Sequence, residues 1–153
     1  MSEEPLISKK VHERLAKDLF NLTWSLLDKE DRTKDDDLKM IHAAHASCYH
    51  WGEIGTPLQF ERGEWQISRV YAVLGRSEPA LFHAKNCLET CEKNAIGDFD
   101  IAFAFEALAR AYAVEGGETN LAKYMAKAKD AAKRIKDEGT KNYFLSELKT
   151  IDV

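Results

Sequence analysis

One seven-residue stretch occurs twice in this chain, at a separation of 41 residues. It reads Arg-Val-Tyr-Ala-Val-Leu-Gly at residues 69–75 and Arg-Ala-Tyr-Ala-Val-Glu-Gly at residues 110–116, so five of the seven positions are identical. Similar helical stretches at a fixed offset are typical of repeat proteins, in which each unit packs mainly on its neighbours. The recurrence therefore predicts a stack of similar helical units, an architecture that usually binds other molecules rather than catalysing a reaction.

Apolar residues recur at intervals of three or four positions, and short polar or glycine-containing links separate these segments, as in amphipathic helices. The expected helices cover residues 8–29, 34–53, 57–75, 77–95, 98–115, 119–136 and 140–149. No segment alternates apolar and polar residues over a strand's length. Because short links force consecutive helices to pack antiparallel, we predict one all-α domain over residues 1–153. It would contain about seven helices, arranged as hairpins at 8–53, 57–95 and 98–136 with a capping helix at the end.

Several residues predict where these helices begin. Ser8 and Asp98 are suitable N-caps, and Thr33 with the acidic residue at position 36 resembles a capping box. Thr56 followed by a proline at the first helical position, with Gln59 two residues further on, predicts a second capping box. The glycine at position 63 interrupts an expected helix and should cost about 1 kcal/mol relative to alanine.

The two hairpins that contain the recurring stretch share a wider pattern. In the first helix of each, an apolar residue is followed by tyrosine four positions later and by glycine after four more, at 67–75 and at 108–116. This pattern resembles the tetratricopeptide repeat, in which small residues let two antiparallel helices approach closely. The resemblance covers residues 61–137 and implies a right-handed superhelix of stacked hairpins. The longer period, the absence of the family's first-helix tryptophan, and Glu92 and Lys133 in place of its closing proline indicate a divergent array.

The resemblance also implies that the first helix of each hairpin lines a concave face. The residues expected to bind a partner there are Arg62, Trp65, Arg69, Phe103, Glu106 and Arg110. Arg69 and Arg110 occupy equivalent positions on adjacent hairpins, so their guanidinium groups could hold the carboxylates of a peptide in bidentate pairs. The alternative is that both arginines are surface residues that pair with Glu106 or with neighbours such as Glu64 on the same face, and that the aromatic residues belong to the core. The final helix could also fold into this face and block it.

Histidine and cysteine residues suggest a different kind of site. The potential ligands are His42, His45, Cys48, His83 and Cys87. If the second and fourth helices were adjacent, these residues could bind zinc or copper in a helical bundle. The opposing interpretation is that buried cysteines act as small hydrophobic residues and that the histidines are half-buried structural groups. We expect no cofactor.

The overall composition narrows the function further. A net charge of −4 without a basic segment argues against a nucleic-acid partner, and no apolar run reaches the ~18 residues needed to cross a membrane. An acidic N-terminus and three cysteines predict a reduced, cytoplasmic protein. No phosphate-binding loop or nucleophile motif is present, so the favoured function is a non-catalytic module that binds a peptide or partner protein. A structural or regulatory homo-oligomer is a further alternative.

Overall fold

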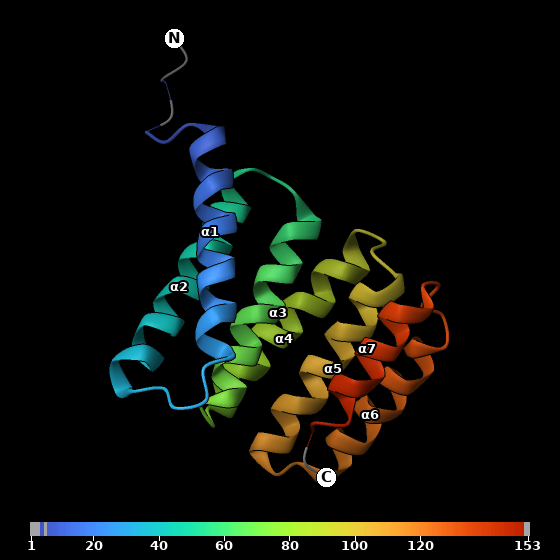
Figure 1. Ribbon diagram of the computed structural model, residues 1–153. Helices are drawn as coiled ribbons and strands as arrows, with labels where there is room; N and C mark the ends of the chain where they lie inside the picture. The colour runs from blue at the N-terminus through green and yellow to red at the C-terminus, as the bar shows by residue number, and fades with distance from the viewer. Residues whose placement is uncertain (1–3, 5, 152–153) are drawn as a thin grey trace.

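The computed structural model describes residue 4 and residues 6–151, and within these it contains seven α-helices and no strand. Figure 1 shows the helices running back and forth from α1 to α7. Their bounds are α1 Lys9–Leu27, α2 Lys34–Glu53, α3 Pro57–Val73, α4 Ser77–Lys93, α5 Asp98–Glu115, α6 Glu118–Ala132 and α7 Glu138–Leu148. The predicted all-α class is therefore confirmed. None of the described helices combines the length and the apolar composition that a membrane span requires.

Consecutive helices form three hairpins, α1–α2, α3–α4 and α5–α6, which stack in chain order. The contacts between hairpins are made by α2 with α3, by α4 with α5, and by α3 with α5. Short turns impose this antiparallel arrangement, and the stack buries the apolar face that each hairpin leaves open. The final helix α7 packs on α5 and α6 (Figure 1).

The recurring sequence pattern occupies equivalent structural positions in α3 and α5. Ile67 and Leu108 are both buried, with 2% and 1% of their surface exposed. Gly75 and Gly116 end the two segments with φ angles of +75° and +87°, a conformation that favours glycine. Between α3 and α4, the Ser68 hydroxyl donates a hydrogen bond of 2.8 Å to the carbonyl of residue 80, which ties the two helices together at a point of close approach.

Some predicted caps form and others do not. Ser8 accepts a hydrogen bond from a backbone N–H of α1, and Thr33 forms the reciprocal capping box of α2. The second predicted box is wrong, because the Thr56 side chain makes no capping hydrogen bond and Gln59 instead lines a surface hollow. Asp98 does not cap α5 either: it is the first residue of that helix, and its carboxylate accepts a hydrogen bond of 3.1 Å from the backbone N–H of residue 136.

The glycine inside α3 marks the closest approach of α2 and α3. A Cβ atom added at Gly63 would lie 2.9 Å from the sulfur of Cys48 and 3.2 Å from its Cα atom. Although alanine favours a helix over glycine, we expect Gly63→Ala to lower the free energy of unfolding by about 1–3 kcal/mol, because the backbone of α2 would have to shift. Urea unfolding measures this change.

The matched control is Gly52→Ala in α2. A Cβ atom there would meet only the Phe60 ring at 3.5 Å, which is an ordinary contact. This substitution should leave stability unchanged or raise it by up to about 1 kcal/mol. If Gly63→Ala were as stable as Gly52→Ala, the close approach of α2 and α3 would be contradicted.

Candidate functional site

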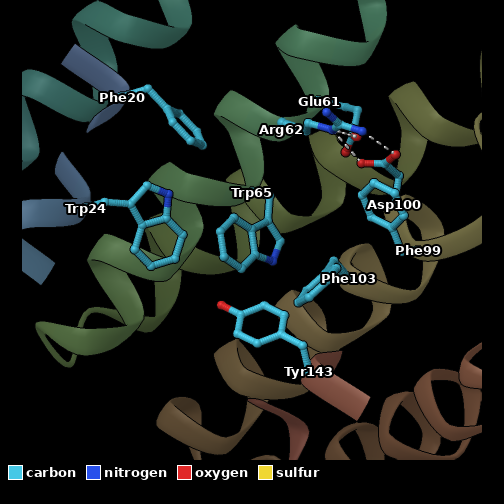
Figure 2. A pocket seen from close by; sticks show the side chains of 9 residues that line it. All are labelled: Phe20, Trp24, Glu61, Arg62, Trp65, Phe99, Asp100, Phe103 and Tyr143. Carbon is cyan, nitrogen blue, oxygen red and sulfur yellow. Dashed lines mark hydrogen bonds and ion pairs between the residues drawn. The ribbon is translucent and has the colours of Figure 1, made fainter. Parts of the chain in front are cut away.

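An open groove lined by aromatic rings lies between α1, α3, α5 and α7. It has a volume of about 170 Å³. Figure 2 shows the rings from these four helices grouped around the groove. The aromatic residues that line it are Phe20, Trp24, Trp65, Phe99, Phe103 and Tyr143. The groove thus collects side chains that are far apart in the sequence on one face of the helix stack.

The rings form a continuous wall. The centroids of Trp24 and Trp65 are 5.6 Å apart, those of Trp65 and Phe103 are 5.5 Å apart, and those of Phe103 and Tyr143 are 6.2 Å apart. These separations fall in the range in which aromatic pairs attract each other. Tyr143 remains 51% exposed, so the wall is accessible to solvent at the α7 side.

A charged pair lies at one end of the groove. Arg62 donates two hydrogen bonds to the carboxylate of Asp100, of 2.9 and 3.0 Å, and its guanidinium carbon is 5.1 Å from the centroid of the Phe99 ring (Figure 2). The bidentate geometry fixes both side chains between α3 and α5. Part of Arg62 stays exposed, whereas Asp100 is buried.

A second hollow of about 250 Å³ adjoins the groove and shares Phe20 and Arg62 with it. It is also lined by Lys17, Trp51 and Gln59. The Oε1 atom of Gln59 is buried and has no hydrogen-bond partner among residues 4 and 6–151. A buried acceptor without a partner destabilises a protein.

Arg69 and Arg110 meet on the same face, as their equivalent positions predicted, but their charges are already paired. Both donate to the buried carboxylate of Glu106, Arg69 over 3.4 Å and Arg110 over 3.0 Å. Arg69 also donates to the carboxylate of Glu147 in α7 over 3.0 Å, and Arg110 donates to the backbone carbonyl of Glu147 and to the hydroxyl of Thr150. The carboxylates that these arginines hold therefore belong to the chain itself, and α7 covers this part of the face.

The indole N–H of Trp65 donates to the same Glu106 carboxylate over 3.2 Å. All six residues that were expected on the concave face thus lie on neighbouring parts of α3 and α5. The structure divides them by environment: Arg62, Trp65 and Phe103 line the groove, whereas Arg69, Glu106 and Arg110 form a mostly buried network under α7.

Three of the five side chains that were considered as metal ligands gather around Glu64: Cys48 and His83 contact its carboxylate, and the His45 ring lies beside that of His83, with centroids 5.3 Å apart. His45 forms a hydrogen bond of 2.8 Å with the Tyr71 hydroxyl, and His83 forms one of 2.6 Å with the Glu64 carboxylate. Cys48 also lies near Glu64, at 3.8 Å from its Oε1 atom, while His42 is exposed. Burial, followed by the neighbouring charge of His83, lowers the pKa of His45.

Within the described residues, only one group of such side chains is compact enough to hold a metal ion, and it differs from the predicted set. It consists of Glu61, Cys87 and Cys91. Burial, followed by the nearby carboxyl group of Asp100, raises the pKa of Glu61 to about 10. Of the predicted ligands only Cys87 takes part, so the predicted five-residue cluster does not form as one site.

The sequence interpretation missed both buried glutamates of α3. Glu61 and Glu64 lie three positions apart and face His83, Cys87 and Cys91, which follow one side of α4. The antiparallel hairpin explains this, because residues early in α3 lie opposite residues late in α4. Matching the two helices in this register would have placed Glu64 opposite His83 and Glu61 opposite Cys87.

Comparison with known proteins provides no relative for this chain. No protein-family model matches it, and neither a curated protein nor a solved structure matches it. The functional argument therefore depends on the geometry of the groove and of the buried side chains.

Proposed function

We propose that this protein is a non-catalytic interaction module that binds a peptide segment of a partner protein in the aromatic groove. The observation that carries the proposal is the wall of six aromatic side chains contributed by four helices. Aromatic residues, tryptophan and tyrosine above all, supply most of the binding energy in protein interfaces. A group of aromatic side chains that stays in contact with water does not help the chain to fold, and such exposed apolar patches usually mark a binding site.

The size of the groove favours a single apolar side chain as its occupant. Sites for drug-sized molecules usually have volumes of about 300–1,000 Å³, whereas the groove has about 170 Å³. A leucine, methionine or aromatic side chain of a peptide fits such a space. The backbone next to this side chain would pass over the adjoining hollow.

Charge places a further condition on the peptide. Lys17 and Arg62 line the adjoining hollow, and Arg62 keeps part of its guanidinium exposed while it holds Asp100. An acidic residue near the apolar anchor would therefore be favoured. In this proposal Arg69 and Arg110 do not bind the partner, because Glu106 and Glu147 already occupy them. Their role is to hold α7 and the groove wall in place.

The proposal also includes the architecture and the compartment. The equivalent burial of the pattern in α3 and α5 and the stacking of the hairpins support a divergent tetratricopeptide-like array. Such arrays commonly present their inner helices to a peptide. Cys48, Cys87 and Cys91 are free thiols, which is typical of a reducing compartment, and we place the protein in the cytoplasm.

A display library of random linear peptides tests the binding function. Selection on the wild-type protein should enrich peptides that share a large apolar residue with an acidic residue nearby. Their affinity for Trp24→Ala and for Tyr143→Ala should fall at least about tenfold, or 1.4 kcal/mol, because each substitution removes a ring from the wall. Isothermal titration calorimetry measures these affinities.

Phe82→Ala is the matched control, since Phe82 is an aromatic residue of α4 that is 60% exposed and does not line the groove. Its peptide affinity should equal that of the wild type. Failure to enrich any peptide, or enriched peptides that bind Trp24→Ala as tightly as the wild type, would refute the groove as the binding site.

A further inference from the structure

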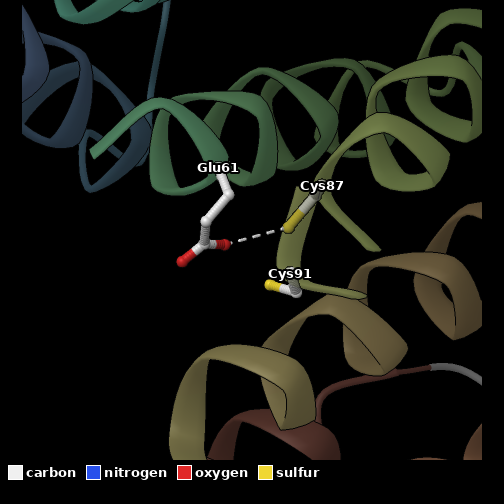
Figure 3. A group of neighbouring side chains, drawn as sticks. All are labelled: Glu61, Cys87 and Cys91. Atoms are coloured by element: carbon white, nitrogen blue, oxygen red, sulfur yellow. Dashed lines mark hydrogen bonds between the residues drawn. The ribbon is translucent and has the colours of Figure 1, made fainter. Parts of the chain in front are cut away.

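Three buried side chains next to the groove converge on one point. Glu61 comes from α3, and Cys87 and Cys91 come from α4 (Figure 3). Their carboxylate and sulfur atoms all lie within 4.8 Å of one another. The exposed fraction is 1% for Glu61 and 0% for each cysteine. The positions buried between helices are normally occupied by apolar residues, so a carboxyl group buried beside two thiols is unusual.

The helix geometry explains why the two sulfur atoms point the same way. Residues four positions apart lie above one another on the same side of an α-helix, so Cys87 and Cys91 both face α3. The Cys87 thiol donates to Oε2 of Glu61 over 3.2 Å, as Figure 3 shows. A pair of cysteines in this register can bind one ion without any change in the helix.

The second oxygen of Glu61 provides independent support. Oε1 is buried and accepts no hydrogen bond from any described residue. The nearest cation, the Nε atom of Arg62, lies 3.9 Å away, beyond hydrogen-bonding distance, and its hydrogen bonds go to Asp100. A buried carboxyl oxygen without a partner costs stability, and natural proteins keep such costs mainly at functional sites.

We propose that Glu61, Cys87 and Cys91 form a buried zinc-binding site. Two thiolates and one carboxylate are ligand types that zinc accepts, whereas copper(I) disfavours the carboxylate and magnesium or calcium disfavours the thiolates. Zinc is usually four-coordinate in proteins. The fourth ligand is a water molecule from the groove, which Glu61 lines. Asp100 is not part of the compact group, and both of its carboxylate oxygens accept hydrogen bonds from Arg62. The groove is also the path by which the ion reaches the site.

This site is separate from peptide binding and from the histidine cluster around Glu64. Glu61 is the only one of the three proposed ligands that also lines the groove. The zinc proposal and the peptide proposal can therefore fail independently. Zinc bound here would link α3 to α4. Because an ion that binds only the folded state stabilises it, zinc should also raise the unfolding temperature.

The test uses the reduced, untagged protein with Zn²⁺ and Co²⁺ as probes. We expect one equivalent of tightly bound zinc by elemental analysis, a higher melting temperature with zinc, and a thiolate-to-cobalt charge-transfer band with Co²⁺. Loss of an outer-shell partner alone weakens metal affinity about 10–100-fold, so Cys87→Ala and Cys91→Ala should weaken it at least about a hundredfold. Glu61→Gln, which keeps the size of the side chain, should weaken it at least about tenfold.

Cys48→Ala is the matched control, because it removes a buried cysteine outside the proposed site. It should bind zinc as the wild type does. Circular dichroism of each metal-free variant checks that the helices have formed, and Glu61→Gln serves if a cysteine variant does not fold. Absence of tight zinc binding by the reduced wild type, or binding that Cys48→Ala abolishes and Glu61→Gln leaves intact, would overturn the proposal.

Discussion

Replacing Glu106 with alanine should lower the free energy of unfolding by about 3–5 kcal/mol, because it removes the carboxylate that pairs with both Arg69 and Arg110. Glu106 is fully buried, and its oxygens also accept the indole hydrogen bond of Trp65. The side chains of Arg69 and Arg110 are only 12% and 14% exposed, so water replaces the lost partner poorly. Urea unfolding measures the change.

Two control variants test whether the loss of stability in Glu106→Ala comes from the buried ion pairs or from removing any carboxylate. Glu106→Gln keeps the hydrogen-bond acceptor and removes the charge, so its stability should lie between those of Glu106→Ala and the wild type. Asp130→Ala breaks an ion pair with Arg134 in which both side chains are more than half exposed. The free energy of unfolding should hardly change, because exposed ion pairs contribute little. If Glu106→Ala were no less stable than Asp130→Ala, the network would not hold the face together.

Replacing Phe144 with alanine should lower the free energy of unfolding by about 3–5 kcal/mol and release α7 from the stack. Phe144 is fully buried in the cluster that joins α5, α6 and α7. Its ring meets Phe103 edge to face, with the centroids 4.9 Å apart. Because the ring is the largest anchor of α7, its loss should also speed hydrogen exchange in residues 138–148 more than elsewhere.

The neighbouring Tyr143 provides the control. Its side chain is half exposed at the groove, so Tyr143→Ala should cost less than about 1 kcal/mol and leave exchange in α7 unchanged. Equal stability of the two variants would show that α7 is not anchored through the core. A stable Tyr143→Ala variant also means that any loss of peptide binding reflects the missing ring rather than unfolding.

The helices could be predicted from the sequence because apolar periodicity and glycine mark them directly. Gly75 and Gly116 end helical segments, as the recurring pattern indicated, and both adopt the left-handed conformation that favours glycine. The cap prediction at Asp98 failed because a tertiary contact competes with local capping, whereas nothing in the structure explains why the Thr56 side chain does not cap α3. Asp98 bonds to the link before α7, a segment whose position cannot be known before the helices are stacked.

The functional residues were harder to predict, because charged residues on helices usually face solvent. Repeat register predicted one shared face, and the structure brings the residues named for it together, since equivalent helices point equivalent residues the same way. They are Arg62, Trp65, Arg69, Phe103, Glu106 and Arg110. Repeat register could not show that α7 supplies Glu147 to that face. Glu61 and Asp100 have no sequence signal of their own, and their burial follows from the close packing of α3, α4 and α5.

Mapping a bound peptide by nuclear magnetic resonance tests the central claim most directly. A library-selected peptide would be titrated into isotope-labelled protein while the backbone amide and tryptophan indole signals are followed. The proposal predicts shifts in the helices that line the groove, α1, α3, α5 and α7, including the indole signals of Trp24 and Trp65. Shifts confined to α2, α4 and α6 would contradict it.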